Sequence, residues 1–481
     1  MKSKVATSRL LQSAFRNSST GLSVLLVSAV LTGMATAAPK LNVLFIVVDD
    51  LRPEVKCYGK ASMVTPHMDR LAKKGVKFNH AYCQYPVCNP SRASFLTGKR
   101  PDELGILNNE ISLRQKWPDL VTLPQLFRNN GYYTAGLGKL FHVGLDDTGK
   151  KTLFRDMASF DHFYRALGKS PAIGHEGKGR KVGGESIPWC SWLAAEGGDE
   201  AQPDGMLASE AVRVLEENRD NPFFISVGFH KPHDPFHAPK EYFEPYPLDQ
   251  VKLAKNPADR TPLLRHALPI HSYDFSKFND QDCREIKRAY RACTTFADAQ
   301  VGKLFETLDR LELWDSTIVV LMGDHGYHLG EHGWWNKVTV FELGARGPMM
   351  IWVPGEKGMG QPTDSVVEFL DLYPTLIDYC GLENPHKLSG KSLRPVLEEP
   401  AKTWDQSAYT QVTRGEVGMG YSVCQGSYRF TQWGKKGQGG YELYDHSKDH
   451  AGYYNLADDP DFAEVRERMD KLLKQGFPAL N

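Results

Sequence analysis

The chain has 481 residues, and its 58 basic side chains balance its 58 acidic ones. Zero net charge excludes a nucleic-acid binder that works through bulk positive charge, although it leaves room for a local positive pocket. With 41% hydrophobic residues, the chain is long enough to bury a large core. We therefore expect one large domain with a smaller appendage.

Residues 1–38 are predicted to be a cleaved signal peptide. Basic residues precede an apolar run over residues 22–31, and the small residues at 35–37 fit a cleavage site. The apolar run is too short to span a membrane comfortably, and no second such run follows in the sequence. The sequence therefore predicts a secreted or periplasmic protein with no membrane association after signal cleavage.

The first predicted strand covers residues 41–48, a continuous apolar run that is typical of a buried strand in a parallel sheet. It ends in Asp49 and Asp50, and two adjacent carboxylates at the end of a buried strand are costly unless something neutralises them. Open α/β sheets bind ligands at this edge, and a divalent cation with oxygen ligands is the natural partner. The alternative is a solvated turn.

A predicted helix start carries the segment Cys88-Asn-Pro-Ser-Arg92, followed by Leu-Thr-Gly at residues 96–98. Pro90 suits the first helical position, so Cys88 is expected just outside the helix N-terminus. Unpaired backbone N–H groups and the guanidinium of Arg92 would favour an anion there. The alternative is a buried Cys beside a turn.

Three further predicted strands also end in polar side chains. Residues 132–137 precede Lys139 and His142, residues 222–229 precede His230, and residues 315–322 precede Asp324 and His325, with Lys337 beyond them. One such group alone would be weak evidence, because Lys and His after a strand are more often ordinary loop residues. Their repetition is stronger, since the C-terminal ends of parallel strands meet at one sheet edge. Residues 324 and 325 would then close the cation site opened at residues 49 and 50.

Strands and helices alternate along most of the chain. One more strand is expected at 348–353, and helices at 66–74 (capped by Thr65), 122–130, 209–218, 283–311 and 368–379. This alternation predicts an α/β fold with a large, mostly parallel sheet covered by helices on both faces. From about residue 400, short alternating segments and a helix at 462–475 predict a smaller α+β subdomain with an antiparallel sheet. The predicted domains are residues 39–400 and 401–481.

The order of these motifs resembles that of the formylglycine-dependent sulfatases of the alkaline phosphatase superfamily. The resemblance covers essentially the whole chain after the signal peptide, from the paired Asp through C-x-P-S-R, G-K-x-x-H and the strand-end His to D-H-G. The segments at 48–53, 138–142, 230–233 and 330–333 look closest to the iduronate-2-sulfatase branch. The resemblance implies a sulfuric ester hydrolase acting on a carbohydrate, with a 2-O-sulfated uronic acid or a related residue of a sulfated polysaccharide as substrate.

The resemblance also implies the composition of the site. Cys88 would be converted to 3-oxoalanine (formylglycine) by a formylglycine-generating enzyme. One Ca²⁺ would be held by Asp49, Asp50, the modified residue 88, Asp324 and His325. Many family members carry Asn where this chain has His325, so another divalent ion stays open.

The implied roles of the remaining residues follow from the same resemblance. Arg92, Lys139 and Lys337 would place positive charge against the sulfate oxygens. His142 would take a proton from the modified residue 88 so that sulfate leaves. His230 would protonate the leaving sugar oxygen, with Lys337 as the alternative donor.

Residues 143–205 are Gly-rich, polar and aromatic, and we expect a long irregular insertion that lines the substrate entrance. Its basic and aromatic residues could meet an acidic glycan or form a solvated face: Lys178, Arg180, Lys181, Trp189 and Trp192.

Two other functions stay open at the level of sequence. A phosphodiesterase or phosphonate monoester hydrolase of the same superfamily would be favoured by a full second metal site, but no second cluster of His and Asp has a suitable order. A non-catalytic glycan-binding relative would be favoured by loss of Cys88, Arg92, Lys139 or His142, all of which are present.

Overall fold

The computed structural model describes residues 40–146, 148–166, 176–184, 187–269 and 273–480. The predicted signal peptide, residues 1–38, lies outside the described residues. Within these ranges, no helix is long and apolar enough to cross a membrane. All eight cysteines fall inside the ranges, and each is a free thiol.

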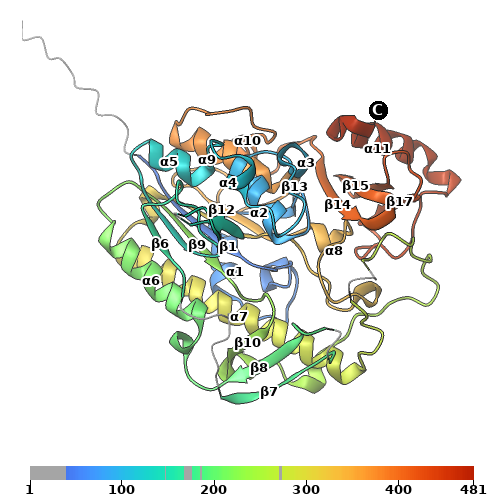
Figure 1. Cartoon of the computed structure of the whole chain (residues 1–481), viewed down its shortest axis with the longest axis horizontal. Coiled ribbons are helices and arrows are strands. Elements are labelled where there is room, and N and C mark those ends of the chain that lie inside the picture. The colour runs from blue at the N-terminus through green and yellow to red at the C-terminus, as the bar shows by residue number, and fades with distance from the viewer. Residues whose placement is uncertain (1–39, 147, 167–175, 185–186, 270–272, 481) are drawn as a thin grey trace, which may run out of the picture. The chain divides into compact units, whose positions relative to one another are not determined.

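An eight-stranded sheet forms the centre of the described chain (Figure 1). Its strands pair in parallel except β12, which is antiparallel to both of its neighbours. In spatial order the strands are β13 (Pro362–Glu368), β2 (Val76–Tyr82), β12 (Met349–Trp352), β11 (Thr317–Gly323), β1 (Asn42–Val48), β9 (Phe223–Phe229), β3 (Tyr133–Gly138) and β6 (His162–Tyr164). The predicted large, mostly parallel sheet is therefore confirmed.

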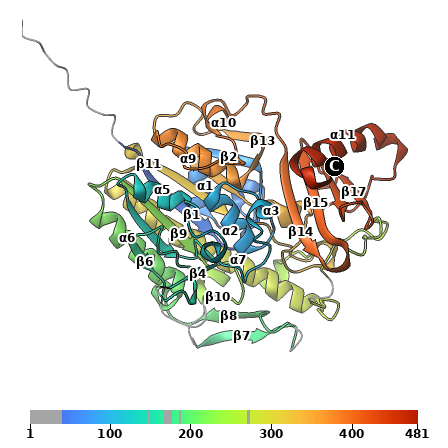
Figure 2. The ribbon, with the colours of Figure 1, turned by 45° about the horizontal axis from the view of Figure 1, so that its top comes forward.

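Strand β1 lies in the middle of this sheet because both of its faces are apolar. Alternate side chains of a strand point to opposite faces. Val43, Phe45 and Val47 pack into the core on one face, whereas Leu44 and Ile46 pack into the core on the other. Helices cover both cores, as Figures 1 and 2 show, and this confirms the predicted arrangement.

The covering helices divide between the two faces. The face of Leu44 is covered by α1 (Pro66–Lys74), α6 (Pro203–Glu217) and α7 (Asp280–Arg310). The face of Val43 is covered by α2 (Cys88–Thr97), α5 (Leu123–Asn129), α9 (Leu372–Cys380) and α10 (Arg394–Glu398). Three shorter helices connect these elements, namely α3 (Pro101–Leu104), α4 (Leu113–Lys116) and α8 (Glu342–Ala345).

Several predicted boundaries differ from the observed ones. Helix α6 begins at Pro203, earlier than predicted, because Pro is well suited to a first helical position. The helix predicted from residue 368 starts one residue later. Glu368 ends strand β13, a 3-10 helix covers Phe369–Asp371, and α9 follows from Leu372. Strands β2 and β13 were not predicted.

The segment at 143–205 is more regular than expected in the parts that the structure describes. It forms a hairpin of β4 (Val143–Leu145) and β5 (Lys151–Leu153), the edge strand β6, and the strands β7 (Gly177–Lys181) and β8 (Ser191–Ala195). These last two make a small sheet with β10 (Phe236–Pro239), which comes later in the chain. Arg180 forms ion pairs with Asp282 and Glu285 of α7, and the Trp192 indole donates to Glu285. These two side chains therefore hold the small sheet to α7.

The C-terminal part contains a four-stranded antiparallel sheet and a helix, as predicted. The elements are β14 (Ala408–Arg414), β15 (Gly418–Gln425), β16 (Tyr428–Trp433), β17 (Tyr441–Asp445) and α11 (Ala463–Gly476). A buried ion pair between Arg429 of β16 and Glu342 of α8 ties this sheet to the segment that follows β11.

The N-terminus of α1 is capped by a residue far away in the sequence. Pro66 opens this helix as predicted, but the side chain of Thr65 makes no capping hydrogen bond. Asp298 of α7 accepts hydrogen bonds from the backbone N–H groups of His67 at 3.1 Å and Met68 at 2.7 Å. Burial raises the pKa of this carboxyl to about 7.

We predict a pH-dependent effect of Asp298→Asn on stability. Between the unfolded pKa near 3.8 and the folded value near 7, the folded chain holds a proton on Asp298 that the unfolded chain has lost. The stability from this group is therefore complete below about pH 4 and is lost as the pH rises through 7. The difference in Tm, variant minus wild type, should therefore become more positive as the pH rises from 4 to 8. Thr65→Ala, which removes no titrating group, should leave the pH slope unchanged; equal slopes for wild type and Asp298→Asn would contradict the prediction.

Candidate active site

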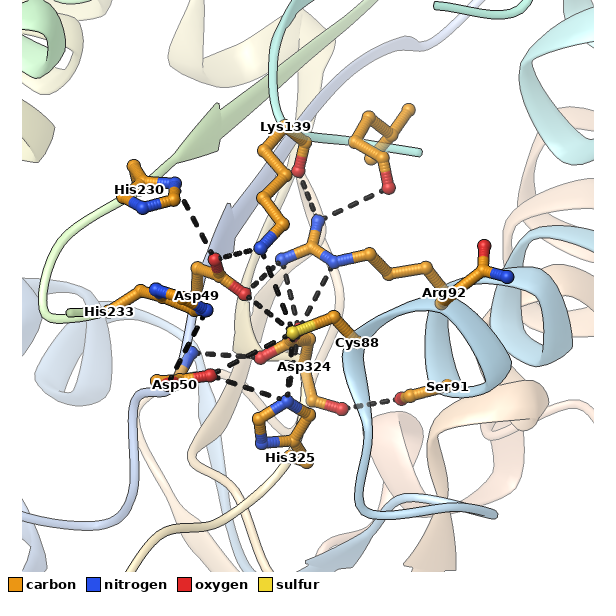
Figure 3. Close-up of polar contacts among 12 residues, drawn as sticks. Asp49, Asp50, Cys88, Ser91, Arg92, Lys139, His230, His233, Asp324 and His325 are labelled. Carbon is orange, nitrogen blue, oxygen red and sulfur yellow. Dashed lines mark hydrogen bonds and ion pairs between the residues drawn. The ribbon is translucent and has the colours of Figure 1, made fainter. Parts of the chain in front are cut away.

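The C-terminal ends of β1, β3, β9 and β11 meet the N-terminus of α2 at one edge of the main sheet. Figure 3 shows the contacts that converge on the sulfur of Cys88. Every residue that the sequence predicted for the site lies in this cluster: Asp49, Asp50, Cys88, Arg92, Lys139, His142, His230, Asp324, His325 and Lys337.

Cys88 is the first residue of α2, and its side chain is fully buried. The helix starts earlier than predicted, since Pro90 is its third residue rather than its first. A Pro is tolerated there because N–H groups of the first turn have no acceptor within the helix. The sulfur lies 3.1 Å from the ammonium of Lys337, 3.4 Å from Nε2 of His325 and 3.5 Å from Oδ1 of Asp49.

The charges around Cys88 favour a negative group at this position. Burial by itself raises the pKa of the thiol, but Lys139, Lys337 and His325 lower it well below its usual value. A hydrogen bond from His142 acts in the same direction. A nucleophile at residue 88 would therefore be stabilised as an anion, and an anionic ester would be attracted to the same place.

Arg92 is completely buried, and acceptors surround its guanidinium. It donates from Nη2 to Oδ1 of Asp49 at 3.0 Å and from Nε to Oδ2 of Asp324 at 3.1 Å. Its Nη1 group donates to the backbone carbonyls of Lys139 and Leu140. Arg92 therefore fixes two carboxylates and the chain after β3 in one arrangement.

Two lysines neutralise the paired carboxylates at the end of β1. The ammonium of Lys139 contacts Asp49, and that of Lys337 contacts Asp50. Burial opposes ionisation of Asp49, but Lys139 and the neighbouring cations hold its pKa well below the usual value. The Asp49 carboxylate is thus kept ionised in a dry environment, where an unpaired charge would be very costly.

The donor groups of this cluster fit a divalent cation. Asp49, Cys88, Asp324 and His325 offer ligand atoms within 4.8 Å of one another, and a second such group replaces residues 324 and 325 with Asp50 and His233. Carboxylate oxygens suit hard cations such as Ca²⁺, whereas the imidazole leaves a transition metal open. In the part of the chain that the structure describes, both groups share Asp49 and Cys88, so they belong to one site.

The turn after β9 is held by a buried carboxylate of α6. Asp204 accepts hydrogen bonds from the backbone N–H groups of His230 at 2.9 Å and Lys231 at 2.8 Å. This places Nδ1 of His230 3.7 Å from Oδ2 of Asp49, with the ring of His233 4.7 Å from that of His230. His233 was not among the predicted site residues, although it lies in the same polar run as His230. Asp204 gave no signal in the sequence, because it fell in the predicted insertion at 143–205, before the helix expected from residue 209.

The backbone at Asp50 adopts a left-handed conformation, with φ of 60°, which is uncommon for a residue with a side chain. One hydroxyl holds the backbone that leaves this residue. Tyr290 of α7 donates to the carbonyl of Asp50 at 2.8 Å and accepts from the N–H of Arg52 at 3.0 Å. Sequence reasoning missed this role, because the periodicity of the helix indicates core packing only.

A comparison with family models gives a match over residues 41–382 to the family described as Sulfatase. The chain belongs to the sulfatase family. A second model, described as N-sulphoglucosamine sulphohydrolase, C-terminal, matches residues 330–477. The chain is accordingly a sulfuric ester hydrolase, as the sequence resemblance implied.

The individual relatives agree with this assignment. The iduronate 2-sulfatase of Mus musculus is 32% identical over 83% of this chain and 85% of its own length. A sulfatase of Formosa agariphila is 31% identical over 90% of this chain and 86% of its own length. Among solved structures, the phosphonate monoester hydrolase of Agrobacterium radiobacter has a TM-score of 0.77 at 23% identity, covering 91% of this chain and 96% of its own. This last likeness shows the fold alone.

We predict that Tyr290→Phe lowers the activity of this sulfatase by more than the loss of stability explains. The change leaves a buried N–H and a buried carbonyl without their partner, which costs about 1–3 kcal/mol of folding free energy. Because the lost bonds hold the carbonyl of Asp50 and the backbone that follows it, kcat should fall about tenfold or more, an effect of about 1.4 kcal/mol on the barrier. Measurements of Tm and steady-state kinetics test this.

Tyr246→Phe is the matched control for Tyr290→Phe. The Tyr246 hydroxyl also makes two hydrogen bonds, one with Thr295 and one from the N–H of Val64, but it touches no site residue. It should lower Tm similarly and leave kcat unchanged. Equal kcat values for both variants would show that Tyr290 has no positioning role.

Proposed function

We propose that this sulfatase hydrolyses sulfate esters on a carbohydrate, and that its substrate is a 2-O-sulfated uronic acid or a related residue of a sulfated polysaccharide. The observation that carries the proposal is the surroundings of the Cys88 sulfur, which lies 3.7 Å or less from two ammonium groups and an imidazole. The similarity to mouse iduronate 2-sulfatase supports a uronate as the sulfated residue.

Two groups would complete the site. We infer that a formylglycine-generating enzyme converts Cys88 to formylglycine, and that Asp49, Asp50, Asp324 and His325, with residue 88, hold one divalent cation, with Ca²⁺ favoured by the carboxylate donors. When present, the cation would stabilise negative charge on oxygen, and the hydrated aldehyde would offer one hydroxyl for attack on sulfur and another for release of sulfate.

The positively charged side chains of the site have two different tasks. The resemblance implied that Arg92 faces the sulfate oxygens. Its donors are instead directed at Asp49, Asp324 and two carbonyl groups, so we assign it to holding those groups in place. Lys139 and Lys337 lie next to residue 88 and provide the positive charge that faces the sulfate oxygens.

Two histidines are placed to move protons. His142 hydrogen-bonds the side chain of residue 88, and it would accept a proton from that side chain when sulfate is released. His230 lies beside Asp49 and would give a proton to the leaving sugar oxygen, with Lys337 as the alternative donor.

Residues 1–38 would direct export, so that the mature enzyme is secreted or periplasmic and meets its substrate outside the cytoplasm. We also propose that residues 39–400 form the catalytic domain and residues 401–481 the C-terminal subdomain.

The alternative of a phosphodiesterase or phosphonate monoester hydrolase finds less support. A full second metal site would favour it, but the two donor groups found in the described residues overlap at Asp49 and Cys88. A non-catalytic glycan-binding role is likewise disfavoured, because the whole set of charged groups surrounds Cys88.

The test of the proposal is sulfate release by enzyme that is co-produced with a formylglycine-generating enzyme. The panel contains a uronate 2-sulfate, other sulfated sugars, and a phosphonate monoester. We expect release from the uronate 2-sulfate and a loss of at least about 10³-fold in Cys88→Ala, as is usual when a nucleophile is removed. Turnover of the phosphonate in preference to every sulfate, or full activity of Cys88→Ala, would overturn the proposal.

Metal binding can be measured without turnover. We predict that Ca²⁺ raises the Tm of the wild type, since a ligand at 100 times its Kd stabilises the folded state by about 2.7 kcal/mol. Asp324→Asn should lose this rise. The control Asp309→Asn, at a surface ion pair with Arg70, should keep it. A calcium response that survives Asp324→Asn would place the ion elsewhere.

A further inference from the structure

A cavity of about 240 Å³ opens beside the catalytic groups. On one side it is lined by residues of the active site, namely Lys139, His142, His230 and His233. On the other side it is lined by Leu153, Phe154, Arg165, Ala166, Pro203 and Leu207. The cavity is therefore shared by the reacting centre and by the segment after β4, which the proposed mechanism does not use.

The size of the cavity limits its contents. Sites for drug-sized ligands are usually about 300–1,000 Å³. A volume of about 240 Å³ thus suits one sugar residue better than a chain of several. Apolar side chains form part of the wall, and Leu153 is 46% exposed at the end of β5. Such a wall suits the C–H faces of a sugar ring.

Phe154 connects Arg165 to the catalytic centre. Its backbone is left-handed, with φ of 68°, and its N–H donates to the carbonyl of His142 at 3.2 Å. A bulky residue in this conformation is strained, and such strain is concentrated at functional sites. The Lys139 ammonium lies 5.9 Å from the centre of the Phe154 ring, and the Arg165 guanidinium lies 5.7 Å from it. A ligand that fills the cavity therefore meets both cations.

The charge of Arg165 has no anionic partner within the described part of the chain. It makes no hydrogen bond or ion pair with any described residue, and its side chain is exposed. Arg92, by contrast, uses its donors on protein acceptors. A free guanidinium presents a planar fork of N–H donors that matches a carboxylate or a sulfate.

We propose that this cavity is the subsite for the sulfated sugar residue itself, and that Arg165 recognises a second anionic group on that residue. This inference rests on the proposed function and makes it more specific. The second anion is a carboxylate or a further sulfate, since both match the guanidinium. Arg165 is then a specificity-determining residue, and the substrate carries two anionic groups on one sugar.

The test compares doubly anionic substrates with matched substrates that carry the sulfate ester alone. The first pair is a uronate 2-sulfate and its methyl ester, and the second is a hexosamine disulfate and the corresponding monosulfate. Arg165→Gln should raise KM about 10- to 100-fold for the member that carries the second anion, as expected for a lost hydrogen bond to a charged group. It should leave kcat, and KM for the singly anionic member, unchanged within about twofold. The pair that responds identifies carboxylate or sulfate as the partner.

Arg155→Gln is the matched control. Arg155 lies in the same segment, but its guanidinium rests over Phe163 and it does not line the cavity. This variant should keep the wild-type KM for all four compounds. Equal effects of Arg165→Gln on the acid and its ester, and on the disulfate and its monosulfate, would overturn the inference, as would the absence of any effect.

A binding measurement separates this inference from the proposed function. Cys88→Ala protein is expected to hydrolyse substrate at least about 10³-fold more slowly, so calorimetry gives its Kd for each compound directly. We expect tighter binding of the doubly anionic member of one pair, and loss of that preference when Arg165→Gln is added. A lack of sulfate release by the wild type, with this preference intact, would contradict the proposed reaction alone. Release of sulfate without any such preference would contradict the role of Arg165 alone.

Discussion

The structure depends on charge compensation around Cys88. Three buried carboxylates, those of Asp49, Asp50 and Asp324, lie within one cluster with the guanidinium of Arg92 and two ammonium groups. Burying charges is unfavourable unless they are paired, and breaking one partner of such a pair typically costs 3–5 kcal/mol. The sheet edge therefore tolerates this concentration of charge only when every strand end is in place.

Support for the cluster comes from elements on both faces of the sheet. Tyr290 of α7 bridges the carbonyl of Asp50 and the N–H of Arg52, and so holds the backbone just after the left-handed residue. Asp204 of α6 fixes the turn at His230. On the other face, the hydroxyl of Ser91 in α2 donates to the carbonyl of Asp324. The geometry of the site is thus set by contacts that are themselves buried, which keeps the charged groups preorganised for a developing negative charge.

Much of this arrangement could be predicted from the sequence, because strand ends in a parallel sheet have a definite place. A run such as residues 41–48 predicts a buried strand, and the polar residues after it then must lie at the ligand-binding edge. By this reasoning Asp49, Asp324 and His325 were predicted to lie close together at one edge of the sheet. The start of α2 was less certain, since Pro90 is compatible with more than one position in the first helical turn.

Other features depend on contacts that no local pattern reveals. Strand β2 contains Lys77, Asn79 and His80, which interrupt its apolar pattern, and β13 begins with a Pro. Tyr290 reaches Asp50 across 240 residues of sequence. Arg165 lies in a segment that is loop-rich by composition, and its significance comes only from the cavity that folding creates beside Lys139.

The most direct test of the central claim is a crystal structure of enzyme co-produced with a formylglycine-generating enzyme and grown with Ca²⁺. The account predicts an aldehyde or its hydrate at residue 88, and an ion bound between this residue and the side chains of Asp49, Asp50, Asp324 and His325. An ion bound elsewhere, or a converted residue 88 turned away from Lys139 and Lys337, would contradict it.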